Sequence, residues 1–165
     1  MPNWLGNLVN SITRKREFRK LSKKLRDLLL GLNPEIVEDF LILLLNVMSL
    51  ALWINKDYRR NIEGFRGKYK FTSKDRKICV SAVFKRSPIF NGDYLKVSDE
   101  NLSDADVTVI FKNSKALMSL LLSPKPDILG TLLRDEVSVA GDVNYIFKLG
   151  FMATQLGQMV LSEGA

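Results

Sequence analysis

The sequence offers few side chains that could carry out catalysis. It contains no histidine among its 165 residues and a single cysteine, Cys79. The absence of histidine removes the usual general base, the usual proton shuttle and the commonest metal ligand. Cys79 lies between two apolar residues of an alternating segment with no histidine to activate it, so we expect a buried, inert thiol. One cysteine cannot form an internal disulfide, which agrees with a reducing compartment.

Two acidic groupings are also poor candidates for a site. Asp135 and Glu136 are adjacent, so in a strand their side chains point to opposite faces and cannot act as an acid–base pair. The stretch SDENLSDAD at 98–106 lacks the glycine and the terminal glutamate of an EF-hand loop, so we expect a solvated loop there. The sequence therefore predicts a protein that is not an enzyme and uses no metal or cofactor.

Positive charge is concentrated in two segments of this chain, whose net charge is +7. Residues 1–32 hold eight Lys or Arg and two acids, and residues 56–77 hold nine and three, so each segment has a net charge of +6. Residues 33–55 and 78–165 carry −3 and −2. This distribution indicates a surface for an anionic partner, either lipid headgroups or nucleic acid.

The longest apolar run is Phe40–Ile54, which only Asn46 and Ser49 interrupt. A helix that spans a bilayer needs about 20 mostly apolar residues, and this run is shorter and closely flanked by charges on both sides. We therefore expect a helix at 36–54 that does not cross a membrane. Because it is apolar on nearly all faces, protein or ligand must enclose it.

The first 32 residues predict helices with two apolar stripes, at 4–12 and 18–32. At 100° per residue the stripes are about half a turn out of phase, so we expect a break near Ser11–Thr13 or two different contacts. Basic side chains occupy the arc opposite the second stripe, Arg26 included. We assign to an anionic membrane surface Lys15, Arg16, Arg19, Lys20, Lys23 and Lys24.

Three roles compete for this basic helix. Besides membrane binding, an ordinary surface helix is the alternative; nucleic-acid binding is disfavoured because aromatic residues are not interleaved with the basic ones. If residues 14–32 do bind membranes, we expect them to act as a lid whose apolar side covers either a cavity or a bilayer.

The pattern after residue 64 changes to a period of two. Alternating segments predict a hairpin with one apolar face, followed by further strands and helices. The order predicts an α+β fold in which helices cover a mostly antiparallel five-stranded sheet. We divide the chain into an N-terminal amphipathic segment, 1–33, and a main domain, 34–165. The expected elements are strands near 65–73, 77–85, 94–97, 106–111 and 135–141, and helices near 113–123, 126–134 and from 143.

Residues 105–156 resemble the sterol carrier protein type 2 family of lipid-binding domains. The resemblance rests on Ala105-Asp106 before a strand, the helix at 117–122, the strand end at 137–142 and the closing helix from Val143. With the upstream strands it covers about residues 36–160. The N-terminal segment lies outside the minimal domain and looks like that of bacterial members that serve as accessory factors in isoprenoid quinone biosynthesis.

The resemblance implies a non-enzymatic protein with an apolar cavity between sheet and helices. Its ligand would be a fatty acyl chain, a phospholipid or an isoprenoid quinone precursor, bound at the cytoplasmic face of the membrane, with biosynthetic enzymes as partners. Ordinary core packing is the alternative for each lining residue. The residues expected to line the cavity are Phe40, Leu44, Met48, Phe84, Leu117, Leu121, Leu132, Phe147 and Phe151.

A different class of function also fits the sequence. The chain could be an interaction or scaffold protein whose basic helix binds a partner or nucleic acid, with no lipid cavity. A continuous apolar tunnel in the interior favours lipid binding, and a filled core at native packing density favours the scaffold.

Overall fold

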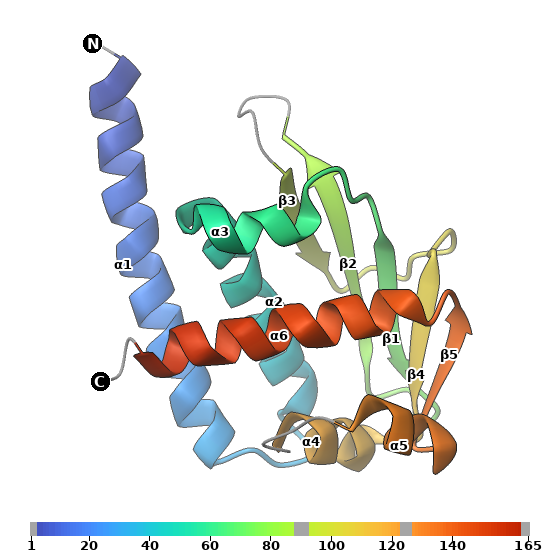
Figure 1. Ribbon diagram of the computed structural model, residues 1–165. Coiled ribbons are helices and arrows are strands. Elements are labelled where there is room, and N and C mark those ends of the chain that lie inside the picture. The colour runs from blue at the N-terminus through green and yellow to red at the C-terminus, as the bar shows by residue number, and fades with distance from the viewer. Residues whose placement is uncertain (1–2, 88–92, 123–126, 163–165) are drawn as a thin grey trace.

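The computed structural model shows a five-stranded sheet with helices gathered on one of its faces (Figure 1). The structure describes residues 3–87, 93–122 and 127–162. The helices are α1 (Asn3–Leu30), α2 (Val37–Ile54), α3 (Lys56–Arg59), the 3-10 turn η1 (Arg60–Ile62), α4 (Ser114–Leu122), α5 (Ile128–Leu133) and α6 (Asn144–Ser162). The strands are β1 (Lys68–Ser73), β2 (Cys79–Arg86), β3 (Asp93–Ser98), β4 (Val107–Phe111) and β5 (Val137–Gly141).

The strand order is β3-β2-β1-β4-β5, and only the β1–β4 pair is parallel. The predicted α+β class and the predicted β1–β2 hairpin are therefore confirmed, with a mixed rather than purely antiparallel sheet. Residues at every second position of β1 are buried, as the period of two requires. Tyr69 and Phe71 of β1 share the helix-covered face with Val80 and Phe84 of β2.

The parallel β1–β4 pair depends on a crossover between β3 and β4. The connection at 99–106 passes over the face of the sheet opposite the helices, where Asp104 pairs with the Lys68 ammonium group. At its end the Asp106 carboxylate accepts a hydrogen bond from Lys68 N at 2.8 Å, and Asp106 N donates to Lys68 O at 2.9 Å. Asp106 thus fixes the register of two strands that no tight turn could join.

Helix α2 is the apolar run, and it lies between the sheet and α1. By length and composition α2 could cross a membrane, since its mean hydropathy is 1.9, and half of it is buried inside the protein. Ser49, one of its two polar interruptions, donates to Leu95 O on the edge strand β3 at 2.8 Å. That bond satisfies the Leu95 carbonyl oxygen at the outer edge of the sheet, where β3 has no neighbouring strand.

Helix α1 is continuous from Asn3 to Leu30, so the predicted break near Ser11–Thr13 is wrong. The phase difference between the stripes therefore does not interrupt the helix, and the second stripe faces α2. Phe18 and Leu25 are buried there within the same core cluster as the sheet residues. Ser22, fully buried between them, is small and allows a close approach of the two helices. The alternative expectation, two different contacts, concerns side chains of residues 4–11 that lie outside those the structure describes, and it stays a prediction.

Gly141 ends β5 in a conformation that side chains rarely adopt, with φ of +107°. A Cβ at this position would lie 2.3 Å from Asp106 O, the residue that sets the β1–β4 register. We expect Gly141→Ala to lower the free energy of unfolding by at least about 2 kcal/mol in urea denaturation.

Gly157 provides the matched control for this substitution. It lies inside α6, and a Cβ there would meet nothing within 4 Å. Gly157→Ala should raise the free energy of unfolding by about 0.5–1 kcal/mol. Equal effects of the two substitutions would show that neither backbone strain nor the contact with Asp106 matters at residue 141.

Candidate functional site

The apolar interior between the sheet and the helices is the candidate site. It is formed by the inner faces of the strands and by α2, α4 and α6. Of the residues expected to line a cavity, Phe40, Met48, Phe84 and Leu117 are at most 3% exposed and belong to one contiguous cluster. The structure therefore brings these four into a common apolar interior, which side chains fill at these positions.

The other five expected residues lie nearer the surface. Leu44, Leu121 and Leu132 are partly buried and pack against the core cluster. Phe147 and Phe151 are 44% and 58% exposed on α6. These two phenylalanines point outward because the opposite side of α6, which carries the buried Met152 and Leu156, packs into the core.

Two leucines of α5 are exposed as well. A Cβ at Gly150 of α6 would lie 2.6 Å from Ile128 Cδ1, so α5 and α6 approach closely at that point. Leu129 and Leu133, the neighbours of the inward-facing α5 residues, are 60% and 79% exposed. We call Leu129, Leu133, Phe147 and Phe151 the α5–α6 apolar face. The sequence analysis did not single out these two leucines. The signal that could have found them is that α5 is short and carries apolar residues on both of its sides.

Two tyrosine hydroxyls hold α6 in place over the interior. Tyr69 of β1 donates to Tyr145 O at 2.7 Å, and Tyr58 of α3 donates to Met152 O at 2.9 Å. Burial raises the pKa of both hydroxyls above the usual range, with smaller contributions to Tyr69 from Tyr145 and Asp106. Both tyrosines therefore stay neutral donors at ordinary pH.

Further along α6, side chains from two other elements make hydrogen bonds. Asn61 Nδ2 donates to Gln155 Oε1 at 2.6 Å, and Arg26 of α1 donates from Nη1 to Val160 O at 2.8 Å. Arg26 is thus partly used inside the protein, although the sequence placed it on the basic arc. Together with the two tyrosine bonds, these contacts attach α6 at four points along its length.

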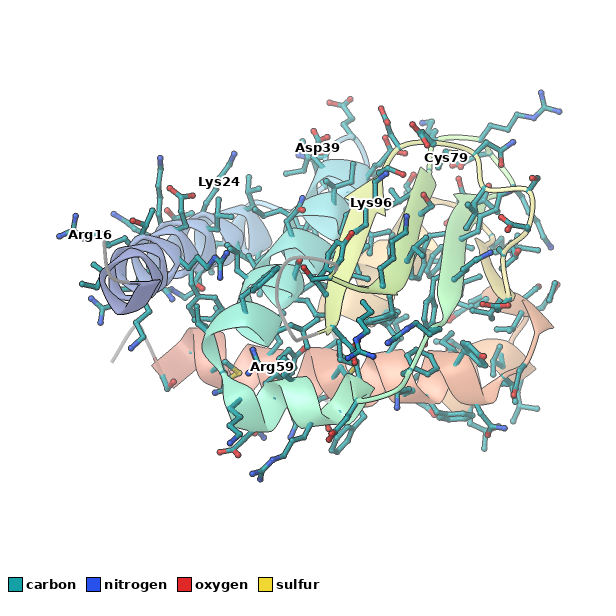
Figure 2. All side chains as sticks on the ribbon, turned by 90° about the horizontal axis from the view of Figure 1, so that it is seen from above. Arg16, Lys24, Asp39, Arg59, Cys79 and Lys96 are labelled. Carbon is teal, nitrogen blue, oxygen red and sulfur yellow. The ribbon has the colours of Figure 1, made fainter. Side chains whose placement is uncertain are left out.

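The basic arc of α1 is exposed on the side away from α2. Arg16 and Lys24 project outward from the helix (Figure 2). The apolar side of α1 is already occupied by α2 and α6, so in this structure α1 does not lie over the sheet as a lid would. All six residues assigned to a membrane surface are exposed: Lys15, Arg16, Arg19, Lys20, Lys23 and Lys24.

The chemistry available in the described part of the chain is that of apolar contact and charge. No group of three or more Cys, Asp or Glu side chains there could hold a metal ion. Cys79 is half-buried, and its backbone N–H donates to the Glu38 carboxylate at 2.7 Å. Glu38 therefore ties the start of α2 to the sheet rather than serving as a free base.

Comparison with known proteins identifies structures of similar fold. No protein-family model and no curated protein matches the sequence. The "UbiJ-SCP2 Ubiquinone synthesis protein" superposes with a TM-score of 0.50 and 20% identity, over 68% of this chain and 90% of that one. This match shows that the chain has the sterol-carrier-protein-2-like fold of that structure.

Two further solved structures are more distant. The sterol carrier protein domain 2 of Helicoverpa armigera has a TM-score of 0.46 and 18% identity, over 75% of this chain and 91% of that one. The inverting sec-alkylsulfatase Pisa1 from Pseudomonas sp. also has a TM-score of 0.46 and 18% identity, over 67% of this chain. The matched region spans 15% of the length of the sulfatase chain.

We predict that Tyr58→Phe loosens the attachment of α6. The Met152 carbonyl keeps its place in the hydrogen bonding of α6, so the loss is that of one ordinary hydrogen bond, about 1 kcal/mol of unfolding free energy. Tyr94→Phe is the control, because the ring of Tyr94 contacts Trp53 and its hydroxyl makes no hydrogen bond to another residue in the described part of the chain. Urea denaturation in which both variants unfold alike would contradict a role for the Tyr58 hydroxyl.

Proposed function

We propose that this protein is a non-catalytic lipid-binding protein that works at the cytoplasmic surface of a membrane. The observation that carries the proposal is the α5–α6 apolar face, where two phenylalanines and two leucines are exposed beside an apolar interior. Exposed apolar patches of this kind are typical of ligand-binding and interaction sites. The sterol-carrier-protein-2-like fold supports the same assignment.

The interior favours a flexible, loosely specified ligand. Met48 and Met152 are completely buried within it, and methionine side chains rearrange readily because they are unbranched. A lipid chain would enter from the α5–α6 apolar face as these side chains move aside. Burial contributes about 25 cal/mol per Å² of apolar surface, which is offset in part by the cost of association.

The ligand class we favour is an isoprenoid quinone precursor. This choice rests on the UbiJ-SCP2 structure, whose description is a ubiquinone synthesis protein. A fatty acyl chain or a phospholipid presents similar surface to leucine and phenylalanine side chains and is the alternative. On the favoured assignment the protein presents its lipid to biosynthetic enzymes.

The exposed basic arc of α1 supports contact with an anionic membrane. Its charged side chains point away from α2, on which Phe18 and Leu25 of α1 are buried, and the apolar residues Ile12, Leu29 and Leu30 of α1 are exposed as well. Lys or Arg near an anionic bilayer contributes about 1 kcal/mol each. We therefore propose that α1 binds the bilayer while it stays packed on α2.

Lipid content tests the proposed function directly. We expect solvent extracts of protein purified without detergent to contain a hydrophobic species in roughly stoichiometric amount by mass spectrometry. Phe147→Gln/Phe151→Gln should weaken the binding of a fluorescent fatty acid by about tenfold or more, because apolar contact area is lost. Both residues are exposed, so the fold should be retained.

Leu161→Gln is the control for the phenylalanine variant, because Leu161 is 68% exposed on the same helix beyond the α5 contact. It should bind the fatty acid as the wild type does. Extracts free of lipid, together with equal fatty acid binding by the phenylalanine variant and the wild type, would contradict the proposal.

Membrane contact predicts a second result. Lys15→Glu/Lys20→Glu/Lys24→Glu should reduce cosedimentation with vesicles that contain phosphatidylglycerol by at least about 100-fold in apparent affinity. Binding of the wild type should also fall as salt screens the charges.

A control of equal net charge distinguishes a local surface from overall basicity. Lys77→Glu/Lys112→Glu/Lys115→Glu changes three exposed residues outside α1 and should have a much smaller effect. If both triple variants lose the same affinity, α1 is not the membrane-binding surface.

A further inference from the structure

A basic hollow of about 480 Å³ is lined by residues of α3, of η1 and the turn after it, of the end of β2 and of the start of β3. Its cationic side chains come from segments that are separate in the sequence. They are Lys56, Arg59, Arg60, Arg66 and Arg86. The carboxylates of Glu63 and Asp93 also line it, so the lining residues have a formal charge of +3.

Two ion pairs between described residues involve side chains of this lining. Arg66 Nη1 lies 2.9 Å from Asp93 Oδ1, and Asp93 also accepts a hydrogen bond from Gly64 N at 3.3 Å. Arg60 Nη1 lies 3.1 Å from Asp57 Oδ1, a residue outside the lining. With Asp57 counted, the formal charges of these side chains sum to +2. Like charges held this close repel one another and favour a bound anion.

Arg59 is oriented by the main chain rather than by a carboxylate. Its Nη1 donates to Leu52 O at 3.3 Å and to Trp53 O at 3.4 Å, in the last turn of α2. These carbonyls lie at the negative end of the helix dipole and have no partner further along the helix. The guanidinium group is thereby held beside the hollow with its full charge, which reduces the cost of ordering it when a ligand binds.

We propose that the basic hollow binds a phosphate-containing anion, such as a phosphomonoester or a diphosphate. Arginine guanidinium groups present paired N–H donors that match phosphate oxygens, and the excess of cationic over anionic side chains in the lining suits a multivalent anion. A volume of about 480 Å³ falls within the usual range of ligand pockets, so a phosphate with its substituent fits. This site is separate from the α5–α6 apolar face and does not depend on the proposed function.

Trp53 of α2 connects the hollow to the side of α1 that faces α2. The Arg14 guanidinium carbon lies 4.1 Å from the centre of the Trp53 ring, and Arg59 donates to the carbonyl oxygen of the same residue. Arg14, in the N-terminal half of α1, and Arg59, in the lining of the hollow, therefore contact the same residue. The phosphate group can come from a lipid headgroup in a bilayer or from a free phosphate compound.

Calorimetric titration of the full chain with inorganic pyrophosphate tests the site. Lys56→Glu/Arg60→Glu changes two exposed residues and should weaken binding by about tenfold or more. Glu63→Gln removes a carboxylate from the lining and should tighten binding about two- to fivefold. Lys112→Glu/Lys115→Glu, with the same change in net charge at the far end of β4, should stay within about twofold of the wild type.

Vesicles of phosphatidylcholine with and without phosphatidic acid distinguish the two sources of phosphate. If Lys56→Glu/Arg60→Glu loses both pyrophosphate and phosphatidic acid binding, the hollow takes a lipid headgroup. If it loses pyrophosphate binding alone, the ligand is a free phosphate compound.

The proposal is overturned if the wild type does not bind pyrophosphate at millimolar concentration. It is also overturned if Lys56→Glu/Arg60→Glu and Lys112→Glu/Lys115→Glu weaken pyrophosphate binding equally while both variants melt at the wild-type temperature. Solvent extracts that contain no lipid would contradict the proposed function but not this phosphate site.

Discussion

The enclosure of α2 is the constraint on which the rest of the structure depends. This helix is apolar on nearly all faces, and nine of its 18 residues are buried. A sheet can cover only one side of a helix, so the other sides need α1, α4 and α6. Phe18 and Leu25 of α1 complete that enclosure. The N-terminal helix is therefore part of the hydrophobic core, even though its outer surface is strongly basic.

The position of α6 follows from this arrangement. Apolar burial is not directional, whereas the hydrogen bonds from Tyr69, Tyr58 and Arg26 to carbonyl groups of α6 fix where the helix lies. With one side held inward, the opposite side must face outward. Phe147 and Phe151 are consequently exposed beside α5, which gives the fold an apolar surface that its own packing does not use.

Charge and apolar surface occupy different parts of the molecule. The basic arc lies on the outer side of α1 and the hollow lies around Arg59 at the end of α2, whereas the α5–α6 apolar face involves Phe147, Phe151 and the close contact at Gly150. Electrostatic attraction acts over about 10 Å in salt solution, while apolar contact acts only at the surface. The two kinds of surface can therefore serve different groups of one amphipathic ligand or two separate ligands.

Local periodicity in the sequence was enough to determine the elements and the fold class. The alternation in β1 and β2, the apolar run of α2 and the basic arc of α1 all depend on neighbouring residues, and each lies in the structure as its period requires. The phase difference between the two apolar stripes of α1 did not produce the predicted break, because the helix is continuous from Asn3 to Leu30. The sequence also grouped nine apolar residues as equivalent, but only tertiary packing separates the buried Phe84 from the exposed Phe151. The parallel β1–β4 pair and the basic hollow join residues distant in the chain. No local pattern encodes such contacts, because they depend on how whole elements pack together.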